Sequence, residues 1–99
     1  MSKERPVETY LCDEVARRGG FYLKLTWVAG IPDRLVVLPH GLISFVELKR
    51  PKGGVVSVIQ SVIHARLRNL GARVDILCNR AEIDKFLNEA DLLKRKRNG

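Results

Sequence analysis

The fold is decided by residues 30–49, GIPDRLVVLPHGLISFVELK. Two apolar runs, 34–38 and 42–49, are rich in branched and aromatic residues, which favour extended backbone. Pro39-His40-Gly41 joins them as a short loop of the hairpin type. We therefore expect an antiparallel pair of strands, in which the start of the first strand lies near the end of the second.

The polar residues of this hairpin fall at its open end. Asp33 opens the first strand directly after Pro32, and alternation places Glu47 and Lys49 on one face of the second strand, about 7 Å apart. Asp33 and Glu47 should therefore meet beside an amine. Two such carboxylates suit Mg²⁺ or Mn²⁺, and the backbone carbonyl of Leu48 would add another oxygen ligand.

The charge of the chain makes these two acids unusual. The net charge is +7, and the segment between Val15 and Val74 has ten basic residues but only Asp33 and Glu47 as acids. Such a surface favours a polyanionic partner, and isolated carboxylates would repel phosphate unless a divalent cation lies between them. Taken singly, each acid is an ordinary turn or strand-edge residue. Together with Lys49 they favour a metal site.

The rest of the chain completes one α/β domain. Apolar periodicity predicts helices at 6–18, 57–70 and 81–93, with further strands at 21–28 and 73–78. The order helix, three strands, helix, strand, helix suits one sheet flanked by helices. A chain of 99 residues, 45% of them hydrophobic, has room for a single domain over 1–99.

Several other classes of protein are not indicated. No apolar run approaches the ~20 residues of a membrane span, and the N-terminus lacks the apolar core of a signal peptide, so we expect an intracellular, cytoplasmic protein without a membrane partner. Cys12 and Cys78 lack zinc-site spacing, and we expect both to be small buried side chains. His40 and His64 have no second ligand at metal-binding spacing and are assigned no chemistry. We expect no nucleotide cofactor.

An ordered set of motifs carries a family resemblance. Ile31-Pro32-Asp33, thirteen intervening residues and then Glu47-Leu48-Lys49 are similar to the PD-(D/E)xK nuclease signature. The wider set includes Glu8, Gly19-Gly20, Lys24, Gly30–Arg34, Phe45–Lys49, Ser57 and Gln60. It resembles the virus-type replication-repair nuclease (VRR-NUC) family over residues 7–78. The last helix and the basic tail, 79–99, lie outside the clear match.

The resemblance implies a restriction-endonuclease-like core with a central mixed sheet of about four strands between helices. It implies that Asp33, Glu47 and the Leu48 carbonyl hold Mg²⁺ or Mn²⁺ and that Lys49 assists the nucleophilic water. Glu8 and Gln60 would complete the site, and Glu8 is a further candidate metal ligand. Small stand-alone members of the family are homodimers that cut four-way (Holliday) junctions, so the resemblance implies a homodimeric DNA endonuclease of a bacterial or phage-infected cell.

Two of these site residues have structural alternatives. Glu8 shares helical spacing with Leu11 and Val15, so its carboxylate points toward the core side and needs a partner there. An acid in a first helical turn also complements the helix dipole. Ser57 and Gln60 fit a capping box, which is a purely structural role for Gln60. The capping and catalytic roles of Gln60 can coexist.

Competing functions remain open at this point. The candidate phosphate contacts are Lys24, Arg34, Arg50, Lys52, Arg66 and Arg68. One alternative is a non-catalytic DNA-binding module in which the acids only shape the fold, and another is a nuclease that acts on flaps, single strands or RNA. Metal-dependent cleavage separates an enzyme from a binding module, and a panel of substrates separates the nucleases from one another.

Overall fold

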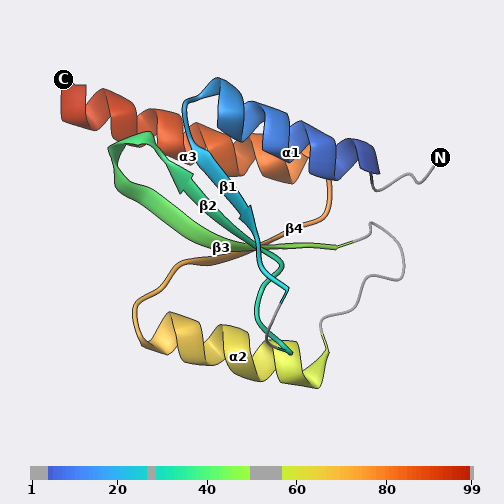
Figure 1. Ribbon diagram of the computed structural model, residues 1–99. Helices are drawn as coiled ribbons and strands as arrows, with labels where there is room; N and C mark the ends of the chain where they lie inside the picture. The colour runs from blue at the N-terminus through green and yellow to red at the C-terminus, as the bar shows by residue number, and fades with distance from the viewer. Residues whose placement is uncertain (1–4, 27–28, 50–56, 99) are drawn as a thin grey trace.

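The computed structural model describes residues 5–26, 29–49 and 57–98. Over these ranges the chain forms α1 (Arg5–Arg17), β1 (Phe21–Lys24), β2 (Arg34–Leu38), a 3₁₀ turn η1 (Pro39–Gly41), β3 (Leu42–Leu48), α2 (Val58–Asn69), β4 (Val74–Leu77) and α3 (Arg80–Asn98). This is the predicted order of helices and strands (Figure 1). None of the helices in the described ranges has the length and apolar character needed to cross a membrane.

The strands form one mixed sheet in the order β1-β2-β3-β4. The pairs β1·β2 and β2·β3 are antiparallel, whereas β3 and β4 are parallel. A parallel neighbour cannot be reached by a tight turn, and α2 lies in the connection between β3 and β4. The predicted mixed sheet flanked by helices is confirmed.

The two faces of the sheet are covered differently. Helices α1 and α3 lie together on one face, and α2 lies on the other (Figure 1). The main core is on the α1–α3 face, because alternate residues of β2 and β3 point there and are buried. Its members include Leu11, Val15, Val36, Leu38, Leu42, Val46, Ile83, Phe86 and Leu87.

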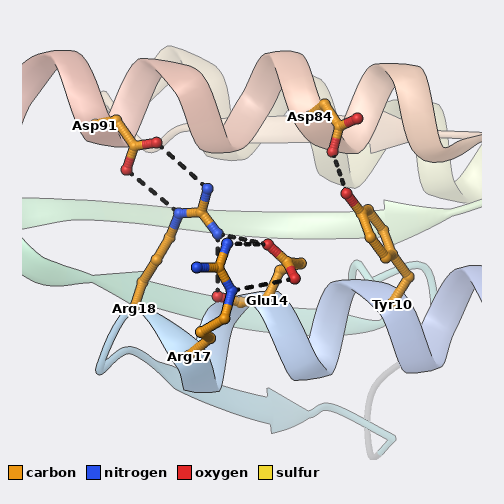
Figure 2. A network of polar contacts seen from close by, with 6 residues as sticks. All are labelled: Tyr10, Glu14, Arg17, Arg18, Asp84 and Asp91. Atoms are coloured by element: carbon orange, nitrogen blue, oxygen red, sulfur yellow. Dashed lines mark hydrogen bonds and ion pairs between the residues drawn. The ribbon is translucent and has the colours of Figure 1, made fainter.

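Polar contacts also join α1 to α3 (Figure 2). The Tyr10 hydroxyl donates to Asp84, and Arg18 pairs with Asp91 at 3.3 Å and with Glu14 at 2.8 Å. Hydrogen bonds from Arg17 and then Arg18 lower the pKa of Glu14 to about 2. Because Arg18 bonds acids on both helices, it fixes the end of α1 against α3.

Two predicted boundaries differ from the structure. Strand β1 ends at Lys24 rather than at 28, because Lys24 pairs with Arg34, the first residue of β2. One further hydrogen bond, from the amide of Leu25 to the carbonyl of Asp33 at 2.7 Å, follows this pair. Residues 27–28 lie outside the described ranges. Helix α3 continues to Asn98 rather than ending at 93, because the basic run 94–97 consists of good helix formers with no glycine or proline before Gly99.

The two cysteines are also less buried than expected. Cys12 and Cys78 are both half-buried and carry free thiols. Burial raises the pKa of the Cys78 thiol, and the nearby Glu82 raises it further. A raised pKa disfavours the reactive thiolate, so this residue has no sign of nucleophilic chemistry.

Candidate active site

Two carboxylates stand at the open end of the β2–β3 hairpin. Arg34 pairs with Val46 in the antiparallel register, so the next residues outward, Asp33 and Glu47, stand opposite each other. Burial raises the pKa of the Glu47 carboxyl, and the adjacent Asp33 raises it further by hydrogen bonding and charge. The structure therefore brings together the two acids that the hairpin was expected to bring together.

Glu47 is the more enclosed of the two acids. It is only 2% exposed, although its carboxylate is a charged group. Its Oε2 accepts a hydrogen bond from Gln60 Nε2 at 3.1 Å and lies 3.3 Å from Lys49 Nζ. Its Oε1 is buried without a hydrogen-bond partner. Burying a carboxylate oxygen without a hydrogen-bond partner costs free energy, so this oxygen marks a place where a bound ligand would fit.

Lys49 and Gln60 complete the surroundings of Glu47. The Lys49 ammonium donates to Gln60 Oε1 at 3.0 Å, while the same amide group donates to Glu47. Gln60 also forms the predicted capping box with Ser57 at the start of α2. The capping role is confirmed, and the same side chain contacts both Glu47 and Lys49. Between these two residues lies Leu48, the last residue of β3.

Glu8 lies in a second group of charges, connected to Asp33 through an arginine. The Arg34 guanidinium lies 2.9 Å from the Glu8 carboxylate and 3.3 Å from that of Asp33, and it donates to the Tyr22 hydroxyl at 2.8 Å. Lys24 lies 3.6 Å from Glu8 on the exposed side. The expected partner of Glu8 is therefore a pair of cations. Arg34 is 8% exposed and already bonded within the chain, a poor position for a phosphate contact.

His64 is a residue of this region that the sequence did not single out. It lies on α2 one turn after Gln60, is 2% exposed, and its Nε2 has no hydrogen-bond partner. Burial lowers the pKa of His64, and the charges of Arg68 and Lys49 lower it further, whereas Asp33 raises it. The sequence could have singled out His64 only if the side of α2 that faces the sheet had been known, because no second metal-binding residue lies at ligand spacing from it.

The other candidate phosphate contacts are distributed over the surface. Lys24, Arg66 and Arg68 are exposed, and one N–H of Arg68 donates to the carbonyl of Val74 at 2.9 Å. The remaining two candidates, Arg50 and Lys52, lie outside the described residues.

The donor atoms at the hairpin end fit a hard divalent cation. Within the described ranges, no three His, Cys, Asp or Glu side chains gather as a metal-binding group, so Glu8 does not join the other two acids. Asp33 and Glu47 do converge, and Mg²⁺ commonly takes only one or two carboxylates and keeps its waters for phosphate. A cation would also give Glu47 Oε1 the partner it lacks and relieve the repulsion between the acids.

Two comparisons place the chain among known proteins, although no family model matches it. It is 43% identical over 77 residues to "Putative nuclease p44" of Acyrthosiphon pisum secondary endosymbiont phage 1, with 76% of this chain and 82% of p44 covered. A solved structure described as "VRR_NUC domain" matches with a TM-score of 0.80 at 33% sequence identity. That match covers 89% of this chain and 97% of the solved one.

The mixed sheet, the acids and lysine at its hairpin end, and these similarities define a nuclease, a hydrolase of nucleic acid. The chain belongs to the VRR-NUC family, as the order of its motifs indicated.

Proposed function

We propose that this nuclease is a metal-dependent DNA endonuclease that cuts four-way (Holliday) junctions as a homodimer in the cytoplasm of a bacterial or phage-infected cell. The observation that carries the metal dependence is the partnerless Oε1 of buried Glu47 beside Asp33. Burying an unpaired carboxylate oxygen destabilises the folded protein, and a ligand bound to that oxygen would offset the cost. A binding module would gain nothing from this arrangement.

The proposed ligands of Mg²⁺ or Mn²⁺ are the carboxylates of Asp33 and Glu47 and the backbone carbonyl of Leu48. When bound, the cation supplies positive charge near the reacting phosphate and makes a water molecule more acidic. Glu8 is not among the proposed ligands, because Arg34 and Lys24 hold its carboxylate. It would instead act on Asp33 through their shared arginine.

Lys49 and Gln60 are assigned to different tasks. The ammonium of Lys49 would position the attacking water and stabilise the negative charge that develops on the phosphate. Gln60 touches both Lys49 and Glu47, so its amide would hold the two groups in their relative positions. Electrostatic groups of this kind are worth ~10²–10³-fold in rate when one is removed.

Substrate binding would use the exposed basic residues. Lys24, Arg66 and Arg68 are the proposed phosphate contacts among the described residues, and Arg50 and Lys52, outside those ranges, are proposed with them. Arg34 is better suited to holding the carboxylates of Glu8 and Asp33, since its guanidinium is already bonded to both.

The test is cleavage of a labelled four-way junction, a flap, a duplex and a single strand, each with Mg²⁺, with Mn²⁺ and with chelator. We expect cutting that requires metal and prefers the junction. Asp33→Asn and Lys49→Met should each lower the rate by about 100-fold or more. Lys85→Met, a change at an exposed position of α3, is the control and should leave the rate unchanged.

Each outcome separates one possibility. Intact DNA at every metal concentration would leave only a binding module. Cleavage retained by Asp33→Asn or Lys49→Met would overturn the assigned roles. A preference for flaps or single strands would keep the nuclease and replace its substrate.

A further inference from the structure

His64 is a buried polar residue to which the proposed chemistry gives no role. Its side chain is 2% exposed, and its Nε2 has no hydrogen-bond partner. Among the residues that the structure describes, the other buried side-chain polar atom without a partner is Oε1 of Glu47. Native folds contain few such atoms, because each costs free energy, so two of them in one region require an explanation.

Helix α2 places His64 over the sheet, next to the site. One turn before it, Gln60 donates to Glu47 at 3.1 Å, and one turn after it, Arg68 donates to the carbonyl of Val74 at 2.9 Å. Residues four apart lie on the same side of a helix, so the side that bears His64 is the side that faces the sheet. His64 therefore lies between the Glu47 end of β3 and the start of β4.

The charges of the site also act on His64. Burial lowers the pKa of its imidazole, and the positive charges of Arg68 and Lys49 lower it further, whereas Asp33 raises it. Lys49 and Asp33 belong to the site, so His64 lies within reach of their charges. An imidazole whose pKa is lowered is neutral at neutral pH, and one of its two ring nitrogens is then a hydrogen-bond acceptor.

The two partnerless atoms suit one hydrated ligand. An ionised carboxylate only accepts hydrogen bonds, so Oε1 of Glu47 needs a cation or a donated hydrogen. His64 does not supply that hydrogen directly, since its Nε2 bonds to no described residue. Mg²⁺ keeps several of its waters when carboxylates bind it, and each of those waters has hydrogens to donate. A neutral ring nitrogen beside such a site is a suitable acceptor for one of them.

We propose that His64 is a positioning residue of the nuclease site, and that its Nε2 accepts a hydrogen bond from a water molecule held beside Oε1 of Glu47. The proposal rests on the proposed function for the cation at Asp33 and Glu47, and it adds a residue outside the set of ligands. His64 would orient this water from the α2 side of the site. Residues that act on a metal site from outside its ligands contribute ~10–100-fold to metal affinity or activity.

The experiment is calorimetric titration of the full chain with Mn²⁺, without DNA. His64→Leu fills the space with an apolar side chain and removes the nitrogen, whereas His64→Gln keeps a polar atom near the place of Nε2. We expect His64→Leu to weaken Mn²⁺ binding by about 10-fold or more, and His64→Gln to retain most of the affinity. Cleavage of the labelled junction at saturating Mn²⁺ should fall in the same order.

His40→Asn is the matched control, because it removes a histidine at the turn that joins β2 to β3, the other end of the hairpin from Asp33 and Glu47. His40 has a φ of +67°, a conformation that asparagine adopts more readily than most residues. The change should therefore leave folding, Mn²⁺ binding and cleavage as they are in the wild type. Circular dichroism in chelator checks that every variant is folded.

Wild-type Mn²⁺ affinity in His64→Leu would overturn the proposal. Equal losses in His64→Leu and His64→Gln would also overturn it, because packing alone would then explain the effect. In both cases the wild type still binds metal and cuts DNA, so the proposed nuclease stands. A wild type that binds no Mn²⁺ and leaves the junction intact would instead overturn the metal-dependent function, and the role of His64 with it.

Discussion

The carboxylate of Glu47 is buried with one oxygen unpartnered, and Asp33 stands beside it. Burial first and Asp33 second raise its pKa above the ordinary value of 4.5. A group whose pKa is raised by folding favours the folded state at acid pH, and that contribution is lost as the pH rises through the folded-state pKa. At neutral pH the charged Glu47 therefore destabilises the metal-free protein.

We expect Glu47→Gln to make the metal-free protein more stable near pH 8, by about 1 kcal/mol or a few degrees in Tm, while abolishing cleavage. The gain should shrink toward pH 4.5, where the wild-type carboxyl also carries a proton. Thermal melts in chelator at the two pH values measure it. Asp13→Asn, on the exposed side of α1, is the control for the loss of one acid. A lower Tm for Glu47→Gln near pH 8 would contradict the account.

Single residues differ in how far their surroundings follow from sequence. The meeting of Asp33 and Glu47 was predictable, because a hairpin and its alternation fix which residues face one another. The bond between Arg34 and Glu8 was not, since it depends on how α1 lies across the sheet. The burial of His64 likewise depends on the rotation of α2 about its axis.

The β1–β2 connection and α2 act as one unit. Gly30 has a φ of +84°, and a Cβ there would lie 2.9 Å from Ile59 Cγ1 and 3.0 Å from the Ile59 carbonyl oxygen. This close approach places Gly30, three residues before Asp33, against the helix that carries Gln60. The glycine and the turn were evident in the sequence. The contact of Gly30 with α2 was not, because the two segments are separated along the chain by β2 and β3.

We expect Gly30→Ala to lower the free energy of unfolding by about 2–4 kcal/mol, through backbone strain and the clash with Ile59. It should also slow cleavage, since Asp33 must shift. Gly71→Ala is the matched control, because Gly71 has a φ of +94° with nothing within 4 Å of an added Cβ. That change should cost only about 1–2 kcal/mol. Urea unfolding measures both, and equal losses would show that the approach to α2 is unimportant.

Element boundaries followed the sequence where a breaker residue was present. Gly19-Gly20 ends α1, and Gly71 follows α2, each within about a residue of the expected position. Strand β1 was expected to be longer because residues 21–28 are rich in aromatic and branched side chains that alternate, yet a strand extends only as far as its neighbour pairs with it. Pairing depends on where β2 begins, a property of two segments together.

At the scale of the whole molecule, a net charge of +7 predicts DNA binding that weakens steeply with salt. The contacts that matter should be those near the Asp33–Glu47 end of the hairpin and not those along α3. Lys24 beside Glu8 and Arg68 on α2 are exposed residues of the first kind, and Lys85 of α3 is one of the second.

We expect Lys24→Ser and Arg68→Ser each to reduce the slope of log affinity against log salt by about 0.9, the value for one lost phosphate contact. Lys85→Ser should leave the slope unchanged. Fluorescence anisotropy on a labelled junction in chelator, which prevents cutting, measures the three variants. The same slope for all three would mean that binding follows net charge and not these particular contacts.

The side-chain oxygen Oε1 of Gln60 accepts hydrogen bonds from both the backbone N–H of Ser57 and the ammonium of Lys49. Removing the lysine therefore disturbs the first turn of a helix as well as the chemistry. For trapping an uncut substrate in a crystal, an inactive Asp33→Asn enzyme is the better choice, because it leaves that turn intact.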